Sequence, residues 1–188
     1  QTRWPCRKCK GLGCDRCNYT GMMYPNSVEE LVGRVALKET RGTDHRFHGM
    51  GREDIDALML GSGRPFVLEI KEPKVRDIDL KAMQDKVNES TEMISISRLR
   101  KSDSDEVVRI KSARPRKSYR VSVLFSGPVD KENLKEVVLS LGGISIAQRT
   151  PKRVSHRRAD KERTRKIEEI DVNVLEPTEA EFNITAEA

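Results

Sequence analysis

The stretch YRVSVLFSGPVDKENLKEVVLSLGG, residues 119–143, sets the expected fold class. Tyr119–Phe125 is rich in β-branched and aromatic residues and is followed by Gly127-Pro128, which predicts a strand that ends at a turn. Lys131–Leu141 then carries apolar residues at helical spacing and stops at Gly142-Gly143, which predicts an amphipathic helix. A strand that leads through a short turn into a helix indicates a fold that mixes both kinds of element.

Further elements are expected on both sides of this stretch. Ser27 and Glu30 form a capping-box pattern at the start of a helix, whose apolar face is Val28, Leu31, Val32, Val35 and Ala36. A second helix is predicted over Asp79–Asn88. Strands are predicted at His45–Gly51, Pro65–Ile70, Ile144–Ala147, Ile167–Leu175 and Phe182–Ala186, with a hairpin formed by Met93–Leu99 and Val107–Ile110. The expected class is therefore α+β, with a mixed, largely antiparallel sheet flanked by helices.

Chain length and net charge limit the number of domains and the kinds of partner that we expect. A chain of 188 residues can bury one sizeable core, with a small module beside it, and we expect a Cys-rich module at residues 1–26 and one domain over 27–188. The net charge of +6 fits a nucleic-acid partner, and it fits a solvated surface rich in Lys and Glu equally well. The sequence contains neither a membrane-length apolar run nor a signal peptide, so the expected location is the cytoplasm.

All four cysteines lie in CRKCKGLGCDRC, as two C-x-x-C pairs formed by Cys6, Cys9, Cys14 and Cys17. Four thiolates satisfy a tetrahedral Zn²⁺ with no position left open, which predicts a structural zinc site. Gly11 and Gly13 allow the tight reversal that brings one pair onto the other. Disulfides are the alternative, but they need a secretory context that the sequence does not show. The flanking basic residues suit phosphate contact or solubility, and both readings stay open.

The loop GREDID, Gly51–Asp56, places three carboxylates and an arginine within six residues. An aspartate kept ionised by a neighbouring guanidinium can act as a nucleophile. The same residues also suit the first turn of an ordinary helix. Two other functions are alternatives to an enzyme with a nucleophilic aspartate. One is a metal-dependent nuclease that uses Asp56, Glu69 and Lys71. The other is a zinc-containing module that binds RNA without chemistry.

Several stretches together resemble the archaeal-type tRNA pseudouridine synthases that act on the TΨC loop. The segments are HGMGREDIDALMLGSGRPFVLEI, the Cys-rich lead-in with the helix after it, KSYRV at 117–121 and QRTPKRVSHRRAD at 148–160. They follow the family's order over nearly the whole chain. The resemblance implies a pseudouridine-synthase-like catalytic domain that isomerises uridine, at tRNA positions 54 and 55, without a cofactor for the chemistry.

The resemblance also implies roles for individual residues. Asp54 matches the family's nucleophile, Arg52 matches the loop arginine that helps displace the target base, and Tyr119 matches the tyrosine that stacks on the flipped uracil. Glu53 and Asp56 are expected to shape the loop. The basic run around Arg153, His156, Arg157 and Arg158 is expected to bind tRNA, chiefly through phosphates, although a solvated surface hairpin would carry similar charge.

The chain departs from the family pattern at its ends. It starts without Met and stops at Ala188 inside an expected strand, so we expect a piece of a longer protein. In the family, a second tyrosine and a Lys or Arg that pairs with the nucleophile follow this point, and an RNA-binding domain precedes the Cys-rich lead-in. By resemblance, the chain is most of a catalytic domain that is inactive by itself. No protein partner can be inferred.

Overall fold

The computed structural model describes residues 2–51, 57–150 and 159–187, and the described chain divides into two compact units. Unit 1 is Gln1–Ala113 and unit 2 is Arg114–Ala188. All strand pairs in the described residues are antiparallel, and they belong to two sheets. The α+β class is confirmed, with the strands distributed over two sheets. The expected domain boundary at residue 26 stays a prediction.

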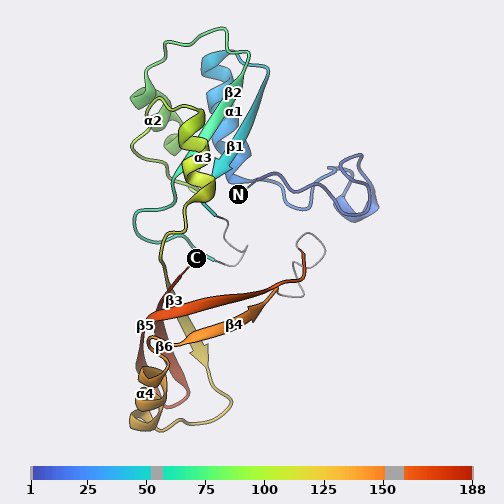
Figure 1. The fold of residues 1–188 in the computed structure, drawn as a ribbon. Helices are drawn as coiled ribbons and strands as arrows, with labels where there is room; N and C mark the ends of the chain where they lie inside the picture. Colours follow the sequence, from blue (N-terminus) through green and yellow to red (C-terminus); the bar gives the residue numbers. More distant parts are fainter. Residues whose placement is uncertain (1, 52–56, 151–158, 188) are drawn as a thin grey trace. The chain divides into compact units, whose positions relative to one another are not determined.

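Unit 1 is built around a two-stranded hairpin (Figure 1). Its elements are the 3-10 turn η1 (Asp15–Cys17), α1 (Val28–Thr40), β1 (Asp44–Gly49), β2 (Phe66–Lys71), α2 (Leu80–Ser90) and α3 (Ser104–Ser112). Both α1 and α3 contact the hairpin. Val32, Val87 and Ile96 form the buried core cluster, with Phe66 and Leu68 of β2 packed against it. The apolar face expected for α1 is therefore the face that packs.

The helices begin where side chains accept hydrogen bonds from free backbone N–H groups. Ser27 caps α1 by accepting from the Glu30 N–H at 3.2 Å, and its hydroxyl donates to the Glu30 carboxylate at 2.7 Å. Asp79 caps α2 and Asp103 caps α3 in the same way. Such caps satisfy donors that the first helical turn leaves without partners, so the polar residues before each helix fix its starting point.

The hairpin expected from Met93–Leu99 and Val107–Ile110 is wrong. Residues 93–100 form no strand, and Val107–Ile110 lies within α3. The Asn88 side chain of α2 bonds both backbone groups of Ile96, at 2.9 and 2.8 Å, and so takes the place of a partner strand. Asp103 then caps a helix whose apolar residue Ile110 is buried. The alternation of Ile and Ser is typical of a strand. An irregular segment that packs one side against a helix can show the same alternation, which is why the pattern misleads here.

In its described residues, unit 2 is a four-stranded antiparallel sheet with one helix. Its elements are β3 (Lys117–Leu124), α4 (Lys131–Ser140), β4 (Ser145–Arg149), β5 (Glu162–Glu176) and β6 (Glu179–Ala186), and the strand order is β3-β6-β5-β4. Helix α4 contacts β5 and buries Val138. The strand–turn–helix expected from residues 119–143 is confirmed, with Asp130 as the helix cap.

The register of the three adjacent strands β3, β6 and β5 separates an apolar face from a polar one. On one face, Tyr119 lies opposite Ile184 and Ile184 opposite Ile170, with further rows of Val and Phe. On the other face, Arg120 lies opposite Asn183, whose amide donates to Asp171 at 3.0 Å. This separation follows from the alternation of side chains along a strand.

Strand β4 pairs with the first part of β5, whereas the rest of β5 pairs with β6. The two strands consequently form an arm that extends from the three-stranded part of the sheet (Figure 1). Every residue of β4 is exposed. In neither unit does the described chain contain a helix with the length and apolar character needed to cross a membrane.

Candidate metal centre and active-site loop

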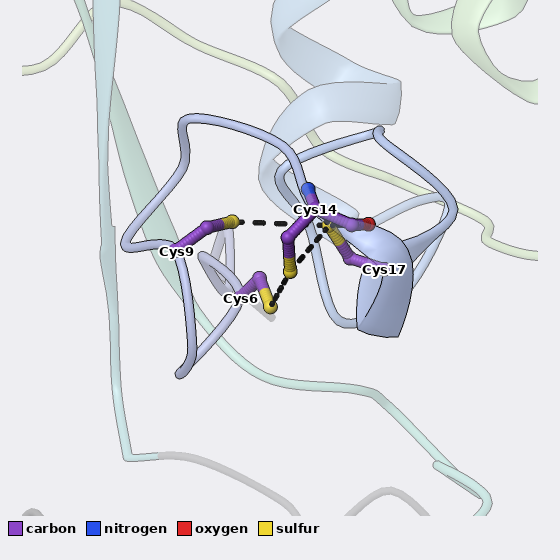
Figure 2. Close-up of side chains that lie close together, drawn as sticks. All are labelled: Cys6, Cys9, Cys14 and Cys17. Atoms are coloured by element: carbon purple, nitrogen blue, oxygen red, sulfur yellow. Dashed lines mark hydrogen bonds between the residues drawn. The ribbon is translucent and has the colours of Figure 1, made fainter.

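The four cysteine sulfurs form a compact cluster. Their Sγ atoms all lie within 4.8 Å of one another, and Figure 2 shows the side chains converging from the two C-x-x-C turns. The Sγ atoms of Cys6 and Cys14, of Cys9 and Cys17, and of Cys14 and Cys17 are each 3.8 Å apart. A tetrahedron with metal–sulfur distances of about 2.3 Å has edges of about 3.8 Å. The four free thiols therefore fit a tetrahedral metal ion.

Backbone N–H groups donate hydrogen bonds to the cysteine sulfurs. Gly13 donates to the Cys9 sulfur at 3.1 Å, and both Cys14 and Gly21 donate to the Cys17 sulfur, at 3.2 and 3.3 Å. Such donors favour the thiolate, which is the form that binds metal. The backbone of the module thus positions the ligands and also stabilises the negative charge of their thiolates.

The thiol pKa values follow from these surroundings. Burial by itself raises the pKa of Cys17, but hydrogen bonds from the N–H groups of Cys14 and Gly21 and with the thiols of Cys14 and Cys9 together lower that pKa to about 6. The N–H of Cys9 is the main cause of a lowered pKa at Cys6. At Cys14 burial dominates and raises the pKa to about 11. Two of the four ligands therefore favour the thiolate before a metal binds.

Glycines allow the chain to fold this tightly. Gly11 and Gly13 both have positive φ, as expected for the reversal between the two pairs. Gly21 also has a positive φ of 73°, and a Cβ there would lie 2.3 Å from the Gly11 carbonyl oxygen. The sequence reading missed Gly21, although a glycine four residues after the last cysteine was the available signal.

The predicted catalytic residues Arg52 and Asp54 lie outside the described residues, as does Asp56. The structure shows the ends of the segment that contains them. This segment connects β1 to β2, and its base is closed by two bonds: the Met50 N–H donates to the Pro65 carbonyl at 3.0 Å, and Arg64 donates to the Met50 carbonyl at 3.1 Å. The GRED sequence therefore belongs to the β1–β2 connection, whose two ends are joined by hydrogen bonds.

Tyr119 lies on β3, at an edge of the unit 2 sheet. It belongs to the apolar face, opposite Ile184, and 48% of the residue is exposed. Tyr119 thus presents an accessible ring beside an apolar surface. This arrangement suits stacking on a planar base, and its assignment to the target uracil stays a prediction.

The predicted RNA-binding residues Arg153, His156, Arg157 and Arg158 also lie outside the described residues. Hydrogen bonds of Thr150 join the two ends of the segment that carries them. Thr150 is buried, its N–H donates to the Lys161 carbonyl at 3.0 Å, and its hydroxyl donates to the Ala159 carbonyl at 2.9 Å. The basic run is thus carried at the end of the β4–β5 arm.

Charge at the base of this arm is partly neutralised. The Arg149 guanidinium donates three hydrogen bonds to the Asp160 carboxylate, at 3.0, 3.1 and 2.6 Å. These bonds lower the pKa of Asp160 and raise that of Arg149. Arg149 is consequently less available for phosphate than its position in the basic run had suggested.

Comparison with known proteins gives the family of the chain. The family model described as Pus10, C-terminal, matches residues 1–188. The chain belongs to this family.

Curated relatives named tRNA pseudouridine synthase Pus10 agree with this membership. The relative from Methanocaldococcus jannaschii is 47% identical over 184 residues, which is 98% of this chain and 40% of the relative. The relative from Methanothermobacter marburgensis is 52% identical over 86% of this chain and 40% of its own length. The relative from Archaeoglobus fulgidus is 48% identical over 89% of this chain and 46% of its own length. This chain of the Pus10 C-terminal family spans less than half the length of these relatives, and the resemblance read from the sequence is confirmed.

In this Pus10 C-terminal chain, the described residues of the nuclease alternative are engaged with neighbours on the hairpin. The Glu69 carboxylate lies 3.1 Å from Nε2 of His48, and the Lys71 ammonium lies 3.4 Å from Asp44. A metal-binding triad would need these groups free to converge with Asp56. Asp56, the third residue of that triad, lies outside the described residues, so the nuclease alternative stays a prediction.

A buried histidine was missed by the sequence reading of this Pus10 family member. His45 is 6% exposed, and its Nδ1 lies 3.5 Å from the Glu29 carboxylate of α1. Gly33 makes the approach possible, because a Cβ there would lie 2.3 Å from Nε2 of His45. A glycine in the middle of a helix was the available signal, since glycine there costs stability unless something packs against it.

Proposed function

We propose that this chain is the catalytic part of a tRNA pseudouridine synthase that isomerises uridine in the TΨC loop, at the adjacent positions 54 and 55. The single observation that supports this most strongly is membership of the Pus10 C-terminal family over residues 1–188. The curated relatives are named tRNA pseudouridine synthases, which supports the reaction and the tRNA substrate. A tRNA substrate also makes the cytoplasm the expected location.

We propose Asp54 as the nucleophile, which attacks the ribose or the uracil ring. The bond from ribose to the ring nitrogen breaks, the base turns, and a bond from ribose to ring carbon forms. The proton on that carbon leaves and the ring nitrogen gains one, so the product has the composition of the substrate. Because nothing is oxidised or transferred, the chemistry requires no cofactor.

Arg52 and Tyr119 are proposed to hold the base during this reaction. Arg52 helps to displace the uracil from the tRNA stack, which must happen before any group can reach it. Tyr119 stacks on the displaced ring, and its half-exposed position on the apolar face of the sheet supports this role. Both residues act by positioning the base for Asp54.

The metal in the cysteine cluster is proposed to be Zn²⁺ in a structural role. Its support is the donor set, since four thiolates at tetrahedral spacing favour zinc and leave no position for substrate. Cys6, Cys9, Cys14 and Cys17 would hold the ion and fix the fold of residues 2–26. No step of the reaction involves this ion.

The basic segment is proposed to contact tRNA through Arg153, His156, Arg157 and Arg158. Its support is the concentration of positive charge on a segment carried by an exposed two-stranded arm. Phosphate contacts of this kind position a folded RNA on the protein surface. A binding module without chemistry remains the second candidate, favoured by the same charge.

The test of the proposed function compares two neighbouring carboxylates in the full-length protein. Asp54→Asn should abolish pseudouridine formation, because the amide keeps the shape of the carboxylate but cannot form the covalent adduct. Glu53→Gln is the matched control and should retain activity. Each variant is incubated with a tRNA transcript, with and without EDTA, and pseudouridine content and chain length are scored by mass spectrometry.

The two alternatives give different results in this assay. A nuclease would shorten the tRNA and would stop when EDTA removes Mg²⁺. A binding module would leave the tRNA chemically unchanged in every sample. Robust isomerisation by Asp54→Asn would disprove the assignment of the nucleophile.

A further inference from the structure

Two large apolar side chains of the cysteine module are almost fully exposed to solvent. Tyr19 is 79% exposed and Leu12 is 93% exposed, although both lie within a few residues of the metal ligands. The other aromatic residues of the module, Trp4 and Tyr24, pack on each other with ring centroids 5.4 Å apart. Tyr19 therefore contributes little to the packing that its module does have.

The backbone of Tyr19 adopts a conformation that disfavours a bulky residue. Its φ is 59°, directly after Asn18 at 48°. Glycine or asparagine adopts this left-handed conformation readily, whereas other residues pay about 1–2 kcal/mol. An exposed ring does not offset that cost by burial, so an aromatic residue here calls for an explanation other than stability.

The position of Tyr19 is nevertheless fixed by the metal-binding turn. Its N–H donates to the Cys14 carbonyl at 2.9 Å. Its carbonyl oxygen packs so close to Gly13 that a Cβ on Gly13 would lie 2.8 Å away. The ring is thus displayed from a defined backbone, and such a preorganised ring loses little conformational freedom when it binds a ligand.

The charge around the ring selects the kind of ligand. Residues 2–26 contain five basic side chains and one acidic one, Asp15, which pairs with Lys8. Lys10 and Arg16 form no ion pair with a carboxylate of the described chain. The module therefore stays positive even when a dication bound by four thiolates adds its charge of −2. Exposed aromatic and basic residues together are the combination that binds unpaired nucleotides by stacking and by phosphate contact.

We propose that the cysteine module binds unpaired nucleotides of the tRNA, with a base stacked on Tyr19 and phosphates contacted by Lys10 and Arg16. Leu12 adds apolar surface in the same module. A protein partner fits less well, because a protein interface tends to exclude unpaired charge from its core. This inference rests on the proposed tRNA-modifying function, and it assigns the module a role in binding substrate besides its structural one.

The test uses a substitution that removes the ring and relieves the backbone at once. In the full-length, zinc-loaded protein, Tyr19→Gly should weaken binding of a tRNA transcript by about fivefold to 100-fold, as expected for the loss of one stacked base. Its thermal midpoint and zinc content should stay the same or rise. Tyr19→Phe keeps the ring and should bind within about twofold of wild type.

The salt dependence of binding separates the ring from the charges. Tyr19→Gly should leave the slope of log affinity against log salt unchanged, since no phosphate contact is lost. Lys10→Ala combined with Arg16→Ala should lower the magnitude of that slope by about one to two units. Leu139→Ala on α4, another exposed leucine, serves as the control for surface substitution.

The remaining outcomes decide against the inference. Unchanged tRNA affinity in Tyr19→Gly would overturn it and would leave the exposed ring to another partner. An equal loss in Tyr19→Phe, or a loss of zinc in both variants, would also overturn it by giving Tyr19 a structural role. Pseudouridine formation by wild type is measured in parallel, so failure of the proposed function is seen separately from failure of the Tyr19 site.

Discussion

At the residue scale, two glycines with nearly equal backbone angles illustrate different constraints. Gly21 has φ of 73° and Gly61 has φ of 69°, so a side chain is strained at either position. A Cβ at Gly21 would meet the Gly11 carbonyl at 2.3 Å, whereas a Cβ at Gly61 would meet nothing within 4 Å. Gly61 therefore shows backbone strain alone, whereas Gly21 shows backbone strain together with close packing against Gly11.

We predict that Gly21→Ala lowers metal affinity and destabilises unit 1 far more than Gly61→Ala. The control should cost about 1–2 kcal/mol from its left-handed backbone alone. Overpacking adds about 1–3 kcal/mol to that cost at Gly21, because the obstacle is backbone and cannot rotate away. Zinc content and chemical unfolding of the two variants check this. Equal effects would show that the Gly11–Gly21 contact does not constrain the module.

At the element scale, helix α3 depends on the surroundings of one carboxylate. Glu106 accepts from the Ser102 hydroxyl at 2.6 Å and from Arg109 at 2.5 Å, and it also bonds Arg100. The bond from Ser102 and those from the two arginines lower the pKa of Glu106 to about 2. This carboxylate joins the residues before the helix to its second turn, so it helps α3 to form where a hairpin had been expected.

We predict that this cluster makes α3 sensitive to acid. The folded pKa of Glu106 lies below its ordinary value of 4.5, so its stabilising contribution is present above pH 4.5 and is lost as the pH falls towards 2. Glu106→Gln should be less stable than wild type at pH 7, and the difference should shrink across this window. Unfolding free energies measured at several pH values check the sign. Glu132→Gln, at an exposed first-turn position of α4, is the control for removing a helical carboxylate.

At the scale of the whole molecule, the residues with proposed roles are distributed over the two units. Unit 1 contains the metal ligands and the hairpin that carries the GRED segment, and unit 2 contains Tyr119 and the basic arm. Residues assigned to one reaction therefore come from both units. In the described residues each unit has its own sheet, so the two can be perturbed separately.

We predict that removal of the metal destabilises the cysteine module without unfolding unit 2. Metal binding energy becomes folding energy for the segment that supplies the ligands, and all four ligands lie in unit 1. Hydrogen exchange measured by mass spectrometry before and after strong chelation should rise in residues 2–26 and stay unchanged in β3, β5 and β6. Faster exchange throughout unit 2 would contradict the prediction.

We also predict that the basic segment at Arg153–Arg158 binds tRNA chiefly through electrostatic contacts with phosphates. Replacing both Arg157 and Arg158 by Ala should weaken tRNA binding and lower the magnitude of its salt slope by about one to two units, if each contacts one phosphate. Arg149→Ala should have a smaller effect, because Asp160 already holds its guanidinium. Titrations at several salt concentrations measure both. An unchanged slope in the double variant would place the arm away from the RNA.

The sequence by itself determined the local features of this protein. The C-x-x-C spacing predicted the thiol cluster, Ser27 predicted the start of α1, and YRVSVLF predicted β3. Four segments together, with GRED and KSYRV among them, predicted the family, which comparison confirmed. These features depend on residues close along the chain, whose spacing and backbone preferences are fixed by covalent geometry.

Only the tertiary structure decided which distant segments meet. It showed that Asn88 holds Ile96 in place of a partner strand, that Gly33 lets His45 approach α1, and that the strands form two sheets. It also placed the Glu69 carboxylate of β2 beside His48 on the neighbouring strand β1. The physical reason is that side-chain period reports which face of a segment is covered, whereas the element that covers it depends on contacts across the fold.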